Sequence, residues 1–448
     1  MEQIPFDPAE PKAALAQLPP KPAVFALYGA EAKDEPYVGR TPNLRGRLER
    51  LLQPSPKHPK RLQLAGRVRH IAWRLTGSEF ESLLTQFSLL EEMYGAKALE
   101  RMHLKAPAFV RYLGSNAYPR IVVTNRPSQR EADWAYGPFA SRGAAERYAE
   151  EALKLFLLRR CTDDLNPDPS FPGCIYSEMK MCLAPCFKGC SDERYADEAR
   201  AVQNFLATRG ESRLVELRAQ REEASGNLEF ETAAAIHEQV QRVEAVRALA
   251  PELVRPMSRL RTAILQTAAG ANEVAVFLFD EGRLRGPAAF STIGMRIQNE
   301  QSGSTSLFAQ PMALEPVPEE SGIRDQGSET SAKAVAGEGV HPGATAMRAA
   351  RTMLETRMEA VLAELEKDTG PASATERQGH LALLKRWYYR PEVKRPGEIF
   401  FPDSDGKWPV KALLRGVGRV AAKAMPVGHP TETPTDTLAE REPAARRD

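Results

Sequence analysis

The five cysteines of this chain all lie between Cys161 and Cys190. The segment around them is rich in Pro and Gly, as in "LNPDPSFPGC", a composition typical of a loop that wraps around a ligand set. In a reducing compartment such thiols do not form a disulfide framework. Clustered thiols without disulfides indicate a metal, and a metal site would constrain the path of the chain strongly.

The length and composition predict several domains. A chain of 448 residues is too long for one compact core and should hold two to four domains. Residues 298–343 are rich in Ser, Gly, Glu and Pro, which predicts a disordered insert, and residues 426–448 resemble a disordered tail. No apolar run approaches the roughly 20 residues of a membrane span, and the first residues lack the features of a signal peptide. We therefore expect a cytoplasmic protein.

Basic residues are concentrated near the N-terminus, although the net charge is only +2. Between Tyr37 and Arg74, Glu49 is the only acid among ten Lys and Arg residues. Such a block suits phosphates, while a solvated face with ordinary charges is the alternative interpretation. The residues predicted to bind DNA are Arg40, Arg45, Arg50, Lys57, Lys60 and Arg61.

The first hundred residues predict a small α+β unit. "AVFALY" (23–28) and "PYVG" (36–39) are typical of two strands of a hairpin, and "RHIAWRL" (69–75) of a third strand. Thr41 is expected to cap a helix that begins at Pro42. The segment "SEFE" (78–81) predicts a capping box for a second helix, whose apolar positions follow helical spacing. Those positions are Leu83, Leu84, Phe87 and Leu90.

Further elements follow, so that the fold class is a multidomain α+β protein. Strands are predicted in "YPRIVVTNR" and "YGPF", and a helix from about residue 142 into "LKLFLLRRC". Two helical patterns between about 211 and 250 flank "SGNLEF" and predict an antiparallel helix pair. "AVFLFDEGRLRGPAAF" predicts a hairpin with residues 280–282 at its turn. Order is expected to return in "TAMRAARTMLETRMEAVLAELEK" and "LALLKRWYYRPEVKRPGEIFF".

The order of these segments resembles a known family. "AVF", "YVG" and "NLRGRL" resemble the GIY-YIG nuclease domain. Together with "YPR", "YGPF", "LKLFLLRRC", "LEFETAA" and "RPGEIFF", they follow the order of the UvrC family of ABC excinucleases from about residue 22 to 399, the insert excepted. The implied domains are an N-terminal segment (1–20), a GIY-YIG-like nuclease domain (21–105), a connecting region with the cysteines (106–195), a helical hairpin (196–255) and a partial ribonuclease-H-like region (256–425).

The resemblance implies a cofactor at the cysteines. Twelve, seven and three residues separate Cys161, Cys174, Cys182 and Cys186, a spacing similar to the segment that the family associates with a 4Fe-4S cluster. Zinc is the alternative, because four thiolates also form a tetrahedral structural site, and unligated thiols are a third possibility. Cys190 has no place in this pattern.

The helix pair resembles the UVR motif, through which the family contacts UvrB. The resemblance implies partner contacts at Leu228, Phe230, Ala233 and Ala234. An internal helix pair without a partner is the alternative. His237 stands where the family often has arginine.

The nuclease-like segment departs from the family at several positions. Tyr37 and Arg47 match a catalytic tyrosine and the phosphate-binding arginine, which in the family act with a glutamate-held Mg2+ or Mn2+. Phe25 and Leu51 stand where tyrosines are expected, and Gln86 replaces the metal-binding glutamate. We therefore expect a degenerate site, with Glu79, Glu81 or Glu91 as alternative carboxylates and Glu81 explained by its capping role.

The resemblance also implies what the chain does. By this resemblance, the sequence stops before the acidic residues of the ribonuclease-H-like region and before the family's tandem helix-hairpin-helix end. The Gly-Val-Gly of "LLRGVGRVAAKA" is interpreted as a chance match to such a hairpin. The expected function is a DNA-binding protein of nucleotide excision repair with an inactive nuclease site. The alternatives are a divergent endonuclease that makes one metal-dependent incision, and a UvrB-binding scaffold without a DNA role.

Overall fold

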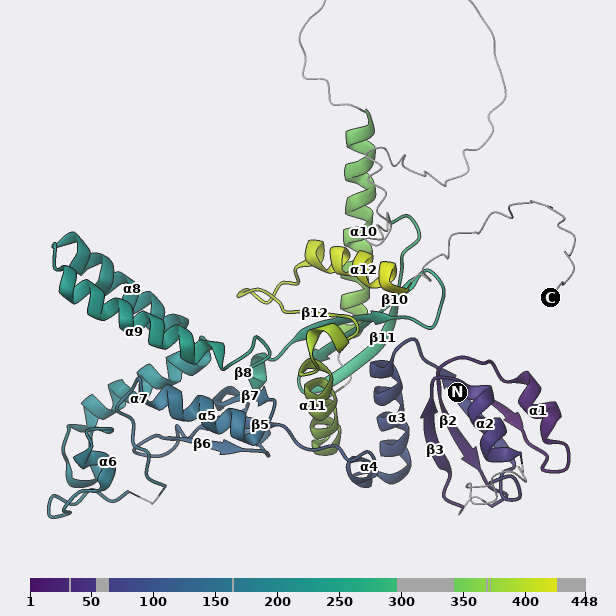
Figure 1. The fold of residues 1–448 in the computed structure, drawn as a ribbon, viewed down its shortest axis with the longest axis horizontal. Coiled ribbons are helices and arrows are strands. Elements are labelled where there is room, and N and C mark those ends of the chain that lie inside the picture. The colour runs from purple at the N-terminus through teal and green to yellow at the C-terminus, as the bar shows by residue number, and fades with distance from the viewer. Residues whose placement is uncertain are drawn as a thin grey trace, which may run out of the picture.

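The protein contains three four-stranded antiparallel sheets, which lie in a row in Figure 1. This computed structural model describes residues 1–31, 34–53, 64–162, 165–295, 342–367, 370 and 372–424. The predicted α+β class is confirmed. The predicted tail and all but the last two residues of the predicted insert lie outside the described residues. No helix in the described ranges is both long enough and apolar enough to cross a membrane.

The N-terminal sheet has the strand order β1-β4-β2-β3. Apolar residues of β2 and β4 pack against α1 and α2 on one face, while α3 contacts β2 and β3 from the other side. The three predicted strands are confirmed, whereas β1 and α1 had no counterpart in the sequence prediction. The elements are β1 (Glu2–Pro5), α1 (Pro11–Gln17), β2 (Ala23–Tyr28), β3 (Tyr37–Thr41), α2 (Leu44–Leu52), β4 (His70–Leu75), α3 (Glu79–Tyr94) and α4 (Lys97–Arg101).

Two predicted helix starts need correction. Helix α2 is capped by Asn43, whose side chain accepts the Gly46 N–H at 2.9 Å, because Thr41 is still part of strand β3. At α3 the cap is Ser78 as predicted, with its Oγ 3.1 Å from the Glu81 nitrogen. The Glu81 carboxylate instead accepts the Gly77 N–H at 2.7 Å, one residue before the cap, so it supports the helix start without forming the reciprocal box.

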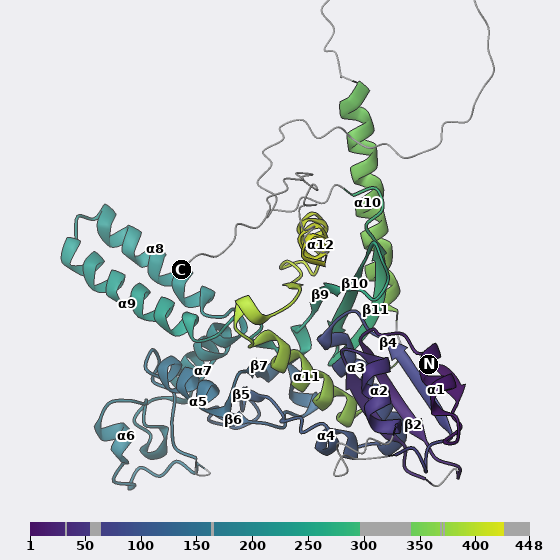
Figure 2. The ribbon, with the colours of Figure 1, turned by 45° about the vertical axis from the view of Figure 1, so that its right-hand side comes forward.

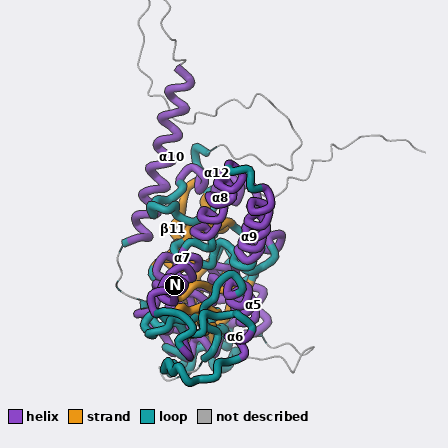
Figure 3. The backbone as a smooth tube through the Cα atoms, turned by 90° about the vertical axis from the view of Figure 1, so that its left-hand side faces the viewer, coloured by secondary structure: helices purple, strands orange, loops and turns teal. Residues whose placement is uncertain are grey.

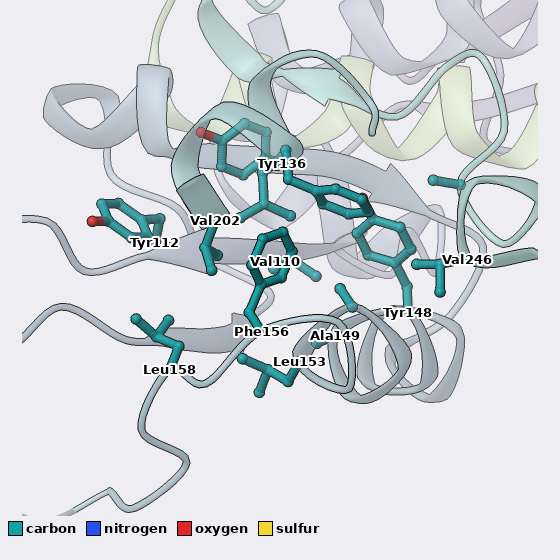
Figure 4. Packing of buried hydrophobic residues seen from close by; sticks show 14 of the residues in the cluster. Val110, Tyr112, Tyr136, Tyr148, Ala149, Leu153, Phe156, Leu158, Val202 and Val246 are labelled. Atoms are coloured by element: carbon teal, nitrogen blue, oxygen red, sulfur yellow. The ribbon is translucent and has the colours of Figure 1, made fainter. Parts of the chain in front are cut away.

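The middle sheet has the order β6-β5-β7-β8, and its last strand follows the helix pair α8–α9 in sequence. Aromatic and branched side chains from this sheet and from α5, α7 and α9 form one core, shown in Figure 4. Helix α5 ends earlier than predicted because Phe156 and Leu158 leave the helical path to enter this core. The elements are β5 (Ala108–Tyr112), β6 (Ile121–Thr124), η1 (Gln129–Trp134), β7 (Ala135–Phe139), α5 (Arg142–Leu153), α6 (Ile175–Glu178), η2 (Pro185–Phe187), α7 (Asp192–Ala207), α8 (Glu211–Gly226), α9 (Phe230–Ala248) and β8 (Arg255–Pro256).

The third sheet has the order β11-β10-β9-β12 and carries the long helix α10, which projects away from it in Figure 3. The predicted β10–β11 hairpin is confirmed, with Glu281 and Gly282 at φ +50° and +83° in its two-residue turn. Helix α12 runs without interruption through Gly416 and Gly418, so it contains no helical hairpin. The elements are η3 (Met257–Arg259), β9 (Thr262–Thr267), β10 (Glu273–Asp280), β11 (Arg283–Ser291), α10 (Pro342–Glu366), α11 (Ala374–Tyr388), η4 (Glu392–Lys394), β12 (Glu398–Phe400) and α12 (Val410–Ala424).

Helix α3 joins the N-terminal sheet to the third sheet. Its Phe80 ring lies 5.2 Å from the ring of Phe277 on β10 and 5.5 Å from that of Trp387 on α11, between ring centroids. Leu83, Leu84 and Phe87 belong to the same buried cluster. Figure 2 shows α3 between the N-terminal strands and the third sheet. The helix is therefore buried by both parts of the molecule.

Candidate functional site

The β2–β3 pair holds the residues that resemble the first part of a nuclease site. Phe25 lies opposite Gly39 in the register, and Tyr37 lies opposite Leu27. The rings of Phe25 and Tyr37 are 6.1 Å apart and tilted by 35°, on the face covered by α1 and α2. A Cβ built on Gly39 would lie 2.7 Å from Cζ of Phe25, so the glycine is required for the ring to cross the neighbouring strand. Phe25 is only 1% exposed, whereas Tyr37 is half-buried.

Tyr28 lies apart from this face, as the sequence predicts from strand alternation. Burial raises the pKa of its phenol, and the charges of Glu92 and Tyr94 on α3 raise it further. Its neighbours therefore belong to the α3 side of the sheet, and it does not supply the hydroxyl that Phe25 lacks.

Helix α2 positions Arg47 beside a buried leucine row. Leu44, Leu48 and Leu51 pack into the N-terminal core, and Leu51 is 5% exposed. Arg47 is half-buried, and no other described residue forms a hydrogen bond or an ion pair with its side chain. The guanidinium is therefore available to an anion, while the Leu51 position offers only apolar surface.

Gln86 comes from α3, on the other side of the sheet. Glu79 at the start of this helix pairs with Arg40 at 3.4 Å, and the Tyr94 hydroxyl at its end donates to the Pro36 carbonyl at 3.2 Å. By helical periodicity Gln86 lies on the same helix face between these two contacts. No hydrogen bond among the described residues joins Gln86 to Tyr37, and we see no ligand group that combines them.

The three alternative carboxylates all take part in packing contacts of α3. Glu79 forms two bonds to Arg390, at 2.8 and 3.0 Å. Glu81 is buried against the Gly77 N–H, and this burial raises the pKa of its carboxyl. Glu91 accepts a hydrogen bond from Ser373 at 3.3 Å, and burial raises its pKa as well. Across the described ranges, no three His, Cys, Asp or Glu side chains come together closely enough to hold a metal ion.

The predicted phosphate-binding residues have different environments. Arg45 donates to the Leu18 and Ala16 carbonyls at 2.7 and 3.0 Å, so its guanidinium caps the end of α1. Arg40 is paired with Glu79. Arg50 is exposed, and its one side-chain hydrogen bond within the described residues runs to Gly46 O of the same helix at 2.9 Å. The structure does not describe Lys57, Lys60 and Arg61. The capping role of Arg45 had no signal in the sequence, because its acceptors are 27 and 29 residues away.

The cysteine segment lies at the end of the middle region, around α6. Burial raises the pKa of the Cys182 thiol, while the Ala184 N–H lowers it and the thiols of Cys174, Cys186 and Cys161 raise it again. The other three predicted ligands therefore lie near Cys182. Their donor chemistry fits a thiolate-bound metal, although the side chains do not stand as a closed ligand group in the described structure.

Two residues near these thiols are distinguished by their contacts. Arg159 is 3% exposed, and it donates to the Tyr118 carbonyl at 3.0 Å and to Cys161 Sγ at 3.5 Å. The pKa of Cys190 is raised by burial and then by Asp192, without a contribution from another thiol. Cys190 thus differs electrostatically from the predicted ligand set.

The helix pair α8–α9 projects from the body of the molecule (Figure 1). Its base is fixed by ion pairs from Arg247 to Glu211 at 3.0 Å and from Arg218 to Glu244 at 3.1 Å. At its tip Leu228 is 72% exposed and Phe230 is 66% exposed. Ala233 is half-buried and Ala234 is exposed on the following turn of α9. The tip therefore presents two large apolar side chains to solvent.

Comparisons with known proteins find sequence relatives for part of this chain. The family "UvrC/Cho excinuclease, middle domain" matches residues 109–205, which run from β5 through β6, β7 and the cysteines into α7. The UvrABC system protein C of Alcanivorax borkumensis is 29% identical over 63% of this chain and 46% of its own length. The chain is UvrC-like.

Other relatives give the same result for this UvrC-like chain. The UvrABC system protein C of Pseudomonas syringae is 31% identical over 52% of this chain and 37% of its own length. That of Pseudomonas aeruginosa is 31% identical over 51% and 37%, respectively. The UvrC-like chain thus matches less than half the length of these relatives. No solved structure matches it.

Proposed function

We propose that this UvrC-like chain binds DNA in nucleotide excision repair and that its nuclease-like site does not cut. The observation that carries the second part is the burial of Phe25 and Leu51, at 1% and 5% exposure. Each stands where the family resemblance calls for a tyrosine hydroxyl, and each is enclosed by apolar core. Loss of one catalytic group commonly reduces a rate by about 10² to 10³, and Gln86 removes the charged metal ligand as well.

A nicking assay tests this proposal. It combines the purified protein with UvrB, lesion-bearing DNA and either Mg2+ or Mn2+. The expected result is no incision above the protein-free background. Cutting that disappears in Tyr37→Phe or Arg47→Ala, but persists in the control Arg142→Ala on exposed α5, would establish nuclease activity at this site and overturn the proposal.

A divergent nuclease is the second candidate, and one observation favours it. Tyr37 and Arg47 keep side chains that are half-buried and without hydrogen-bond partners among the described residues. Such an enzyme would still need a carboxylate for its metal, but Glu79, Glu81 and Glu91 are engaged in packing contacts. We therefore favour DNA binding over cleavage.

The salt dependence of the affinity for DNA distinguishes DNA binding from a scaffold role. Binding through phosphates weakens as salt rises, because counterions are released on association. We expect Arg47→Gln and Arg50→Gln each to reduce the affinity and the slope of this dependence. A wild-type affinity that is absent or independent of salt would favour a UvrB-binding scaffold without a DNA role.

We further propose that the hairpin tip contacts a UvrB-like partner through Leu228 and Phe230. Both large apolar side chains are exposed to solvent at the end of a projecting helix pair, which is unfavourable in free energy. Binding of a partner there would bury them. Leu228→Ser with Phe230→Ser should abolish co-purification with UvrB, while Val215→Ser, another exposed apolar position on α8, should not. Equal retention of UvrB by both variants would show that the α8–α9 helix pair packs within the chain and does not contact UvrB through its tip.

At the cysteines we propose a 4Fe-4S cluster held by Cys161, Cys174, Cys182 and Cys186, with zinc as the alternative. Their mutual effect on the pKa of Cys182 and the N–H groups near Cys182 and Cys186 support a thiolate site. A bound cluster would fix the loop and join the segments around α6. Anaerobically purified protein should contain iron and sulfide and absorb at about 400 nm, whereas zinc without this absorbance would select the alternative. Cys190→Ser should leave the metal content unchanged.

A further inference from the structure

Four arginines line a cavity between the middle and third sheets. The cavity has a volume of about 480 Å³, and its walls come from the end of α7, from the segment between β8 and β9, and from the loop before α12. Figure 1 shows this last loop, in yellow, reaching toward β8. The lining arginines are Arg209, Arg255, Arg259 and Arg261.

Two of these arginines are held in place by groups that do not line the cavity. Arg255 pairs with Glu252 at 3.1 Å, and its guanidinium lies 4.3 Å from the centroid of the Phe401 ring. Arg261 pairs with Glu366 at 2.6 Å and with Asp280 at 3.2 Å. These contacts fix the guanidinium planes before any ligand arrives, which reduces the entropy lost on binding.

The other two arginines have no carboxylate partner among the described residues. Arg209 donates to the Ala250 carbonyl at 3.3 Å, while its buried Nε has no acceptor in the described structure. Its backbone has φ +52°, a conformation that non-glycine residues rarely adopt. Arg259 is exposed, and nothing described pairs with it.

The residues that line the cavity carry more positive than negative charge. Asp403 is the one acidic residue among the lining residues, and its carboxylate accepts the N–H groups of Asp405 and Lys407 at 3.0 and 2.8 Å. Burial lowers the pKa of Arg255, the charge of Glu252 opposes this effect, and the charge of Arg209 adds to it. Because Arg209 and Arg255 line the same cavity, an anion bound there would offset the repulsion between their charges.

We propose that this cavity binds phosphate groups of a nucleic-acid backbone. The planar forks of several arginines match phosphate oxygens, whereas no aromatic residue lines the cavity on which a base could stack. The contact is therefore independent of base sequence. The choice of nucleic acid as the source of the phosphates rests on the proposed function, and a free oligophosphate presents the same chemistry.

Fluorescence anisotropy with a short labelled oligothymidine tests the cavity over a series of salt concentrations. Arg209→Gln with Arg259→Gln should weaken binding roughly tenfold and make the logarithmic salt dependence shallower by about 1.4, or about 0.7 for each lost phosphate contact on a single strand. The matched control Arg147→Gln with Arg242→Gln removes the same charge from exposed positions on α5 and α9 and should change neither quantity. Arg259→Gln alone, at an exposed position, should make the slope shallower by about 0.7 without affecting folding.

Inorganic tripolyphosphate distinguishes the two sources of phosphate. With a nucleic-acid site, tripolyphosphate at the same phosphate concentration should displace little oligonucleotide, because the longer strand also contacts basic residues outside the cavity. A free-oligophosphate site gives strong competition and a higher Tm that the double variant loses. If wild-type protein binds no oligonucleotide, the proposed function and the nucleic-acid source fail, but this Tm increase would still support a phosphate site. Cavity variants that match the control in both measurements overturn the site, even when Arg47→Gln weakens DNA binding.

Discussion

At the scale of single residues, His380 is a buried base that stays neutral in the folded protein. Its Nδ1 accepts the Leu284 N–H at 3.0 Å, and its ring lies 5.5 Å from that of Phe87. Burial lowers the pKa of His380 from 6.5 to about 4, the charge of Glu376 opposes this effect, and that of Arg283 adds to it. The imidazole thus connects β11, α11 and α3 only in its uncharged form.

This depressed pKa predicts a loss of stability in acid. Between pH 6.5 and about 4 the unfolded chain binds a proton at His380 that the folded protein does not, so the free energy of unfolding falls as the pH falls. The full contribution is at most roughly 3 kcal/mol. Urea unfolding at several pH values should show a flatter profile for His380→Asn, whose Oδ1 can also accept the Leu284 N–H. Parallel profiles for the two proteins would contradict the assignment.

At the scale of elements, two helical glycines have opposite roles. A Cβ at Gly379 on α11 would overlap the ring of Phe87, which is fully buried on α3. A Cβ at Gly418 on α12 would meet no atom within 4 Å. The first glycine permits two helices to approach closely, whereas the second only weakens its helix.

The two alanine substitutions should therefore change stability in opposite directions. We expect Gly379→Ala to destabilise by about 1–3 kcal/mol through overpacking, despite the better helix propensity of alanine. Gly418→Ala should stabilise by about 0.5–1 kcal/mol, since alanine restricts the unfolded chain and favours the helix. Chemical denaturation of both variants measures the difference. Stabilisation by both substitutions would show that α11 and α3 can move apart at little cost.

Local signals explain which elements the sequence could predict. A run of strand-forming residues before a polar turn located β2, and strand alternation located β4. The turn at Glu281–Gly282 located the β10–β11 hairpin, because all these patterns depend on adjacent residues. Strand β1 was missed because four residues carry little periodicity, and its pairing with β4 depends on residues far along the chain. The end of α5 was missed for a similar reason, since only the core around Phe156 shows that the chain must turn there.

The same distinction applies to the candidate sites. The unusual residues at Phe25 and Leu51 could be identified from a family pattern, and the structure adds that both are enclosed by core. The pairing of Arg45 with the end of α1 could not be predicted, because no local pattern links a guanidinium to carbonyls in another helix. The arginine cavity was also invisible in the sequence, since tertiary folding brings its three segments together.

At the scale of the whole molecule, α3 makes the N-terminal sheet and the third sheet one mechanical unit. In addition to the buried contacts of this helix, its Glu79 pairs with both Arg40 on β3 and Arg390 beyond α11. The Thr267 hydroxyl on β9 also donates to the Gly77 carbonyl at 2.5 Å. The middle region has a second core around Phe205, although its Phe109 and Ala135 belong to the cluster around α3. A perturbation at α3 should therefore reach both the N-terminal and the third sheet, whereas one at Phe205 should stay within the middle region.

Hydrogen exchange of two matched variants tests this coupling. Phe87→Ala and Phe205→Ala each remove a fully buried ring, at a cost of about 3–5 kcal/mol. In Phe87→Ala, exchange should accelerate both in β2–β3 and in β9–β10, because the cavity lies in the cluster that α3 shares with the third sheet. In Phe205→Ala, the faster exchange should be confined to the middle sheet, α7 and the base of the hairpin. If exchange in Phe87→Ala accelerates in β9–β10 but not in β2–β3, the N-terminal sheet folds independently of the contacts of α3. The nuclease-like surface would then be able to move relative to the rest of the chain.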